Sequence, residues 1–189
     1  MAVPTTEFKS QTTDIPGLLI FDITSIGDQR GWFQEKYQRE KLVAAGLPNN
    51  FNVVQTNIAY NKEVGVARGF HAEPWDKYLS VASGKVFVAY VDLRAGDSFG
   101  KVVTAEVDNN KAVYVPKGVG NSYQTLTEDV YYIYSVTDHW RAENYGVYPA
   151  VNMTDPAMAV NWPIAMAQAI VSDRDRNLPN LSSINPIEL

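Results

Sequence analysis

The candidate chemistry of this sequence lies around one histidine, because histidine is scarce and cysteine is absent. The chain has two histidines, His71 and His139, and no cysteine, which excludes thiol catalysis, disulfides and thiolate metal sites. His71 shares a short segment with Arg68, Glu73 and Lys77. An imidazole can transfer protons near neutral pH, and a nearby ammonium can hold an anion. The segment therefore indicates a base beside an anion-holding lysine, although a loop with solvated charges has the same residue types.

Metal and cofactor chemistry have little support in this segment. A metal centre built on imidazoles needs several histidines with a carboxylate, whereas His71 and Glu73 are the main candidates here. The sequence also lacks a glycine-rich dinucleotide-binding motif. We expect no metal and no cofactor.

Length and composition describe one domain over residues 1–189. The chain of 189 residues is 46% hydrophobic and 20% charged, which is typical of a folded domain with a single core. Its formal net charge of −5 argues against nucleic acid as a partner, because binding a phosphate backbone requires clustered lysine and arginine. The apolar run at residues 17–21 is too short for a signal peptide or a membrane span. We expect a cytoplasmic protein with no membrane partner.

The elements that must position His71 are predicted to be mainly strands. Short runs of β-branched and aromatic residues alternate with Gly, Asn, Asp and Pro, which indicates an all-β sandwich or barrel, a class that includes jelly rolls. Strands are expected over residues 17–23, 52–59, 78–82, 85–93, 102–107, 112–115 and 130–136. Short helices are expected over residues 33–45 and 164–170, and residues 1–16 are expected to form a partly ordered arm.

Nine short motifs occur in order along most of the chain. Four of them are Asp28–Glu35 (Asp-x-Arg-Gly-x-Phe-x-Glu), Arg68–His71 (Arg-Gly-Phe-His), Tyr134–Asp138 (Tyr-x-x-Thr-Asp) and Ser172–Asp175 (Ser-x-x-Asp). The others are Gln55–Asn57, Val91–Arg94, Ser98–Gly100, Pro116–Gly118, and Asp155-Pro156 with Trp162-Pro163. Each motif alone is weak, but the ordered series resembles the dTDP-4-dehydrorhamnose 3,5-epimerases, which are non-metal cupins. The resemblance implies a cupin-type jelly-roll β-sandwich with a few short peripheral helices.

The resemblance implies an isomerase that acts on a nucleotide-linked 4-keto-6-deoxyhexose. Such enzymes convert dTDP-4-dehydro-6-deoxy-D-glucose to dTDP-4-dehydro-L-rhamnose by inverting C3 and C5, whose protons are acidified by the adjacent ketone. His71 matches the catalytic base of the family, and Asp175 matches the carboxylate that orients it. Lys77 matches the residue that holds the developing enolate, and Tyr134 matches the acid that reprotonates the opposite face.

The resemblance also implies how the substrate is held. Arg30 and Arg68 match guanidinium groups suited to the diphosphate. The other positions implied to bind substrate are Phe33, Glu35, Gln55, Asn57, Asn121 and Glu143. Asn121 stands where many members have a histidine, so its amide can hydrogen-bond but cannot carry a charge. The N-terminal motif of the family often crosses a dimer interface, so a homodimer is expected.

Three other functions are left open. A related cupin could invert one centre or isomerise the ketone of a similar nucleotide sugar, and a non-catalytic cupin could bind a sugar nucleotide without turnover. The set of His71, Lys77, Tyr134 and Asp175 argues against pure binding, because a binder needs no matched acid and base. The residues do not decide how many centres are inverted.

Overall fold

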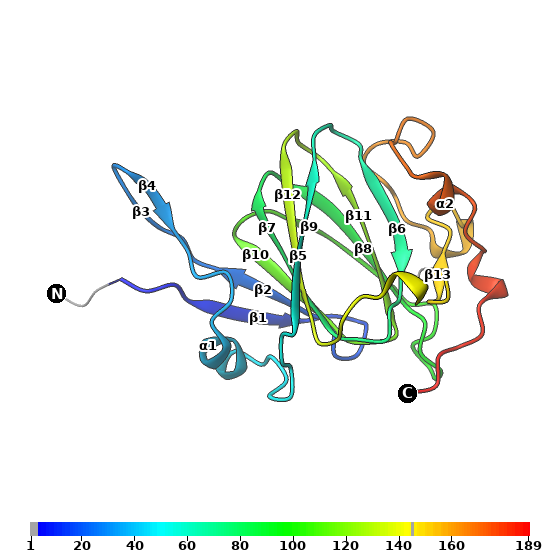
Figure 1. Ribbon diagram of the computed structural model, residues 1–189, viewed down its shortest axis with the longest axis horizontal. Helices are drawn as coiled ribbons and strands as arrows, with labels where there is room; N and C mark the ends of the chain where they lie inside the picture. The colour runs from blue at the N-terminus through cyan, green and yellow to red at the C-terminus, as the bar shows by residue number, and fades with distance from the viewer. Residues whose placement is uncertain (1–3, 145) are drawn as a thin grey trace.

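The computed structural model describes residues 4–144 and 146–189 and consists mainly of two antiparallel sheets that face each other (Figure 1). The six-stranded sheet contains, in spatial order, β1 (Phe8–Thr12), β2 (Leu19–Ile23), β10 (Lys111–Val115), β7 (Lys77–Ser83), β12 (Val130–Val136) and β5 (Gln55–Asn61). The five-stranded sheet contains β13 (Ala150–Val151), β6 (Ala67–His71), β11 (Val119–Thr125), β8 (Val86–Asp92) and β9 (Val102–Val107). This architecture confirms the predicted all-β sandwich.

Strand prediction succeeds where apolar runs are dense and fails where they are not. The sequence predicts β2, β5, β7, β8, β9, β10 and β12, with small shifts at some ends. It does not predict β1, β6, β11 or β13. The strands β6 and β11 contain Gly, Asn, Arg and Gln, which are not typical strand residues. They form because β6 pairs with β11 and β11 pairs with β8 inside the five-stranded sheet.

The helices are short and lie at the periphery. They are α1 (Arg39–Ala44), α2 (Asp173–Arg176) and the 3-10 helices η1 (Ala142–Asn144), η2 (Pro156–Met158) and η3 (Leu181–Ser183). The helix predicted over residues 33–45 is too long, because α1 begins only after Gln38, whose side chain caps it by accepting from the Lys41 N–H. The helix predicted over residues 164–170 is wrong. Buried Gln124 hydrogen-bonds both the N–H and the carbonyl of Ile164, each at 2.9 Å, and fixes that segment in turns.

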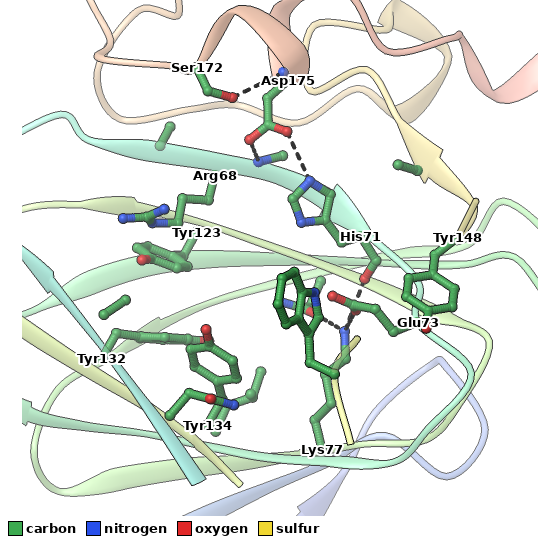
Figure 2. Close-up of a pocket in the computed structure, with 18 of the residues that line it drawn as sticks. Arg68, His71, Glu73, Lys77, Tyr123, Tyr132, Tyr134, Tyr148, Ser172 and Asp175 are labelled. Carbon is green, nitrogen blue, oxygen red and sulfur yellow. Dashed lines mark hydrogen bonds and ion pairs between the residues drawn. The ribbon is translucent and has the colours of Figure 1, made fainter. Parts of the chain in front are cut away.

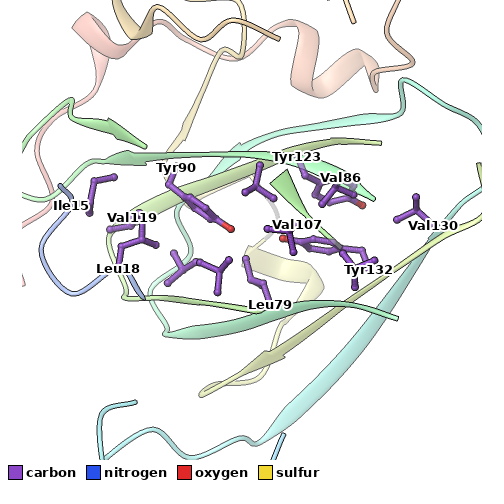
Figure 3. Close-up of a cluster of buried hydrophobic side chains, with 14 residues drawn as sticks. Ile15, Leu18, Leu79, Val86, Tyr90, Val107, Val119, Tyr123, Val130 and Tyr132 are labelled. Carbon is purple, nitrogen blue, oxygen red and sulfur yellow. The ribbon is translucent and has the colours of Figure 1, made fainter. Parts of the chain in front are cut away.

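The main hydrophobic core fills the space between the two sheets (Figure 3). Alternate residues of a strand point to the same face, so β7 contributes Leu79 and Val81, and β8 contributes Val86 and Tyr90. A second cluster packs under the α1 region, and a third packs beneath the C-terminal segment. The α1 region and the C-terminal segment therefore cover sheet faces that would otherwise expose apolar residues to water.

The same alternation places polar groups of two neighbouring strands inside the sandwich. Gln55 and Asn57 on β5 and Tyr134 on β12 face inward and line a cavity. On the other face of the same two strands, Ile58 of β5 and Tyr131 of β12 point outward and are 64% and 44% exposed. The edge of the six-stranded sheet thus has a polar inner face and an apolar outer face.

A separate hairpin projects away from the two sheets (Figure 1). It consists of β3 (Ile26–Asp28) and β4 (Gly31–Phe33), which pair with no other strand in the described part of the chain. Trp32 and Phe33 are 54% and 64% exposed, so the hairpin presents aromatic rings away from the core of its own chain. Among the described residues, no helix is long and apolar enough to cross a membrane.

Candidate active site

A cavity of about 710 Å³ lies between the two sheets and is lined by residues from both. This volume falls in the range of pockets that enclose small organic ligands. The cavity brings together eight of the predicted site residues, which are Gln55, Asn57, Arg68, His71, Lys77, Asn121, Tyr134 and Asp175. The four residues predicted to perform proton transfer therefore share one cavity, although 104 residues separate His71 from Asp175.

His71 and Asp175 form a hydrogen-bonded pair at the cavity wall (Figure 2). His71 Nε2 lies 2.9 Å from Asp175 Oδ1, and the Gly69 N–H donates to Oδ2 at 3.0 Å. Burial alone would raise the pKa of Asp175, but the hydrogen bonds from His71 and Gly69 outweigh it and lower that pKa. Because an ionised carboxylate only accepts hydrogen bonds, we assign the proton to Nε2. The Nδ1 atom is then left free to act as a base.

Local structure around α2 explains how Asp175 reaches His71. Ser172 caps the helix by accepting from the Asp175 N–H at 3.1 Å, which fixes the start of the turn that carries Asp175. Gly69 lies directly beneath this turn. A Cβ atom at Gly69 would lie 3.2 Å from both Cβ and Cγ of Asp175. The glycine therefore allows the carboxylate to approach β6 closely.

Lys77 is a buried cation at the start of β7, and its side chain is 5% exposed. Its ammonium donates to the His71 carbonyl at 3.1 Å, to the Glu73 carboxylate and to the Asn121 side-chain oxygen. The ammonium of Lys77 is thus held close to His71 by acceptors from β6 and β11 of the opposing five-stranded sheet and from the loop between β6 and β7. A positive charge in this position can stabilise an oxyanion that forms in the cavity.

Tyr134 faces His71 across the cavity (Figure 2). It comes from β12 of the six-stranded sheet, whereas His71 comes from β6 of the opposing sheet. Burial raises the pKa of Tyr134, the charge of Glu73 raises it further, and Arg68 partly offsets both. The phenol therefore remains protonated at neutral pH and is suited to donate a proton. An acid and a base on facing sheets can act on opposite faces of one ligand.

The amides and the arginine that were predicted to bind substrate occupy other parts of the wall. Gln55 donates to the Asn57 side chain at 2.8 Å and accepts from the Trp140 N–H at 3.0 Å. Arg68 lies in the cavity wall on the exposed side of β6, near Tyr123. These groups can hydrogen-bond a polar ligand, and Arg68 can pair with an anion.

Four residues predicted to bind substrate lie outside this cavity. Arg30 is 85% exposed on the β3–β4 hairpin and pairs with Asp28 at 2.5 Å, and Phe33 is exposed on the same hairpin. The Glu35 carboxylate lies 2.5 Å from the Lys41 ammonium, and Glu143 is exposed on η1. Within a single chain these residues do not meet the cavity, and their binding roles remain predictions.

Further cavity residues were absent from the predicted set. Glu73 binds Lys77, and Trp75 packs edge-on against Tyr148 with ring centroids 5.3 Å apart. Glu73 and Trp75 follow His71 within four residues, so the segment around the histidine could have indicated both. Tyr148 lies ten residues after the predicted Tyr134–Asp138 motif and carries no comparable signal. No group of three or more His, Cys, Asp or Glu side chains in residues 4–144 and 146–189 could hold a metal ion.

Sequence comparisons agree on one family. A family model described as dTDP-4-dehydrorhamnose 3,5-epimerase matches residues 12–183. A protein described as an RmlC homolog, from Streptococcus pyogenes serotype M6, is 45% identical over 93% of this chain and 90% of that protein. A dTDP-4-dehydrorhamnose 3,5-epimerase from Sinorhizobium fredii is 30% identical over 94% of this chain and 92% of that protein. A dTDP-4-dehydro-6-deoxyglucose 3-epimerase from a Streptomyces species is also 30% identical, over 86% of this chain and 83% of that protein.

Structural comparison agrees with this result. RmlC from Streptococcus suis, whose structure contains dTDP-D-xylose, is similar with a TM-score of 0.91 and 41% identity. The similarity covers 96% of this chain and 95% of that chain, which confirms the predicted cupin-type fold. From the sequence match over most of its length and the shared fold, the chain belongs to the dTDP-4-dehydrorhamnose 3,5-epimerase family.

Proposed function

We propose that this protein converts dTDP-4-dehydro-6-deoxy-D-glucose to dTDP-4-dehydro-L-rhamnose by inverting C3 and C5. The observation that carries the proposal is the placement of His71 and Tyr134 on facing sheets of one cavity, with the Lys77 ammonium beside them. The S. suis protein binds a dTDP-sugar and shares this fold, which supports a nucleotide sugar as the ligand.

The chemistry begins with removal of a proton beside the ketone. Nδ1 of His71 takes the proton from C3 or C5, and the electrons of the C–H bond move into the carbonyl to give an enolate. Asp175 stabilises the imidazolium that results. The Lys77 ammonium stabilises the negative charge on the enolate oxygen. An enolate formed beside a buried cation is favoured because water screens the attraction poorly there.

Inversion requires the new proton to arrive from the other face. The Tyr134 phenol donates its proton to the planar carbon from the side of β12, and the enolate returns to the ketone. His71 then releases its proton to solvent and Tyr134 regains one. The substrate is isomerised with no net redox change, so this scheme consumes no oxidant or reductant.

Epimerisation at one centre is the second candidate, because a relative at 30% identity is described as a 3-epimerase. Incubation with the C3,C5-protonated substrate and proton NMR of the product distinguish the two. Inversion of both centres supports the main proposal, and inversion of C3 alone supports the alternative. Ketone isomerisation or binding without turnover is supported less well, because Tyr134 and His71, the proposed acid and base, line opposite sides of the cavity.

We also propose that the protein works as a homodimer with shared sites. Arg30 and Phe33 lie on a hairpin that projects away from the cavity of their own chain. A second copy could receive this hairpin, and the partner subunit's Arg30 would then supplement Arg68 at the diphosphate. The apolar outer face of β5 and β12 offers a contact surface, since Ile58, Tyr60 and Tyr131 are 64%, 49% and 44% exposed.

A further inference from the structure

Each N–H donor of the Lys77 ammonium already has an acceptor among the described residues. An ammonium has three N–H donors. Lys77 uses them on the His71 carbonyl, the Glu73 carboxylate and the Asn121 side-chain oxygen. The side chain is 5% exposed, so its environment is set by these acceptors. For Lys77 to hold an enolate oxygen, one of the three acceptors must give way.

The three acceptors differ in how readily they can be displaced. The His71 carbonyl belongs to β6, which is paired with both β11 and β13 at this residue. The Glu73 carboxylate is charged and only 21% exposed, so separating it from Lys77 would leave two poorly solvated charges. The Asn121 amide is neutral, and its side chain can rotate without breaking a strand. The amide is therefore the acceptor that a ketone oxygen displaces most easily.

We propose that Glu73 is a positioning residue of the epimerisation, an inference that rests on the proposed function. Its carboxylate holds the Lys77 ammonium in place and balances its charge while the 4-keto oxygen of the substrate replaces the Asn121 amide. Without a nearby anion, burial favours the neutral form of an amine, and a neutral amine is a weak stabiliser of an enolate.

The charge of Glu73 has a second consequence for His71. During the reaction His71 becomes an imidazolium, and the Lys77 Nζ atom lies only 3.1 Å from the carbonyl of the same residue. Two neighbouring cations would repel each other in this partly buried cavity. The Glu73 carboxylate is bonded to the Lys77 ammonium and interacts electrostatically with His71, so it offsets this repulsion. Burial would raise the pKa of Glu73, but Lys77 and His71 lower it, so the residue is an anion at neutral pH.

Other charged and titratable groups line the same cavity around Lys77. They are Arg68 and His71 on β6, Tyr123 on β11, Tyr132 and Tyr134 on β12, Tyr148, and Arg174 and Asp175 on α2. Asp175 is paired with His71 and the Gly69 N–H. Among the described groups bonded to the Lys77 ammonium, Glu73 supplies the negative charge. A pH effect transmitted through Lys77 should therefore depend on Glu73.

The test compares Glu73→Gln with Glu73→Asp in steady-state turnover of dTDP-4-dehydro-6-deoxy-D-glucose. Glutamine keeps the size and an acceptor oxygen but removes the charge, whereas aspartate keeps the charge on a shorter stem. We expect Glu73→Gln to lower kcat at least about tenfold, with KM changed by less than about threefold. As the pH rises, the kcat of Glu73→Gln should begin to fall at a lower pH than the kcat of the unsubstituted protein. Glu73→Asp should keep the alkaline limb of the unsubstituted protein and at least about a tenth of its kcat.

Glu106→Gln is the matched control, because Glu106 forms an exposed pair with Lys85 at 3.0 Å on β9, outside the cavity. It should match the unsubstituted protein. Calorimetric titration with dTDP should show similar affinity for Glu73→Gln and the unsubstituted protein, which separates loss of turnover from loss of folding.

An unchanged kcat and pH profile in Glu73→Gln would overturn the inference. A lower kcat with an unmoved alkaline limb would also overturn it, because it would indicate a structural role. If Glu73→Gln does not fold, Glu73→Asp decides, and a folded aspartate variant that loses more than about 100-fold in kcat contradicts the inference. If the unsubstituted protein itself neither epimerises nor exchanges substrate protons, the proposed function fails instead.

Discussion

The Asp175 carboxylate lies 2.9 Å from Nε2 of His71, and its other oxygen accepts from the Gly69 N–H two residues earlier in the same strand. The C-terminal turn is thus bound to both the backbone and the imidazole of β6. This double contact fixes the ring orientation and its tautomer, and it leaves Nδ1 free. The proposed role of His71 as a base depends on this contact.

Asp175→Asn should lower kcat by about 10²- to 10⁴-fold with a small change in KM. An amide cannot stabilise the imidazolium, and it can impose the wrong tautomer on His71. Asp173→Asn, on the exposed side of the same turn, is the control and should retain normal activity. Steady-state kinetics decide, and equal activity of the two variants would remove Asp175 from the proposed dyad.

Gly69→Ala should lower kcat at least about tenfold, because the added Cβ would meet Asp175 at 3.2 Å and shift its carboxylate. Overpacking at this contact should also lower the free energy of unfolding by about 1–3 kcal/mol. Urea denaturation and kinetics together provide the check. A variant with native kcat would show that the carboxylate tolerates displacement.

The stability of the protein should depend on the ionisation of Asp175 in acid. The pKa of Asp175 is lower in the folded chain than the ordinary value of about 3.9 expected for the unfolded chain. Its contribution to stability is therefore complete above pH 4 and is lost as the pH falls through the folded pKa. The difference in unfolding free energy between the unsubstituted protein and Asp175→Asn should shrink below pH 4. A constant difference from pH 7 to pH 2 would contradict this linkage.

Tyr134→Phe should separate proton exchange from inversion. The variant keeps the ring and loses the hydroxyl, so His71 can still remove a proton and return it to the same face. In deuterated water we expect deuterium to enter the substrate while little epimerised product forms, as read by NMR. Full inversion by this variant would mean that another acid acts from the side of β12.

The shared-site model predicts a dimer in sedimentation at micromolar concentration. Arg30→Ala and His71→Ala should each be inactive as homodimers. After subunit exchange, a mixed dimer carries both lesions in one site and none in the other, so activity should return. Confirmed exchange without recovery of activity would mean that each site is built from one chain, and an active monomer would exclude the dimer model altogether.

The sequence predicts the fold class and much of the cavity for a physical reason. Dense apolar runs such as residues 86–92 indicate strands locally, and the motifs around His71 and Asp175 contain residues that we propose transfer protons. Residues whose role depends on contacts with distant parts of the chain are harder to predict from the sequence. The strand β11 forms through pairing with β6 and β8, and residues 164–170 are held in turns through the Gln124 side chain.

In the candidate site, too, some residues can be predicted from their neighbours in the sequence, whereas others depend on contacts made by the fold. Glu73 lies two residues after His71, yet its role depends on the ammonium of Lys77 and the amide of Asn121, which the fold brings together. The hairpin residues Arg30 and Phe33 carry a motif but lie away from the cavity of their own chain. No pattern in the sequence specifies a surface that would contact them.

The central claim is that His71 removes protons from both C3 and C5, and deuterium exchange tests it most directly. The unsubstituted protein, His71→Asn and His139→Asn are each incubated with dTDP-4-dehydro-6-deoxy-D-glucose in deuterated water, and NMR follows both carbons. His139 is exposed and lies outside the cavity, so its variant is the matched control. The account predicts deuterium at C3 and C5 with the unsubstituted protein and with His139→Asn, and none above background with His71→Asn. Near-native exchange by His71→Asn would contradict it.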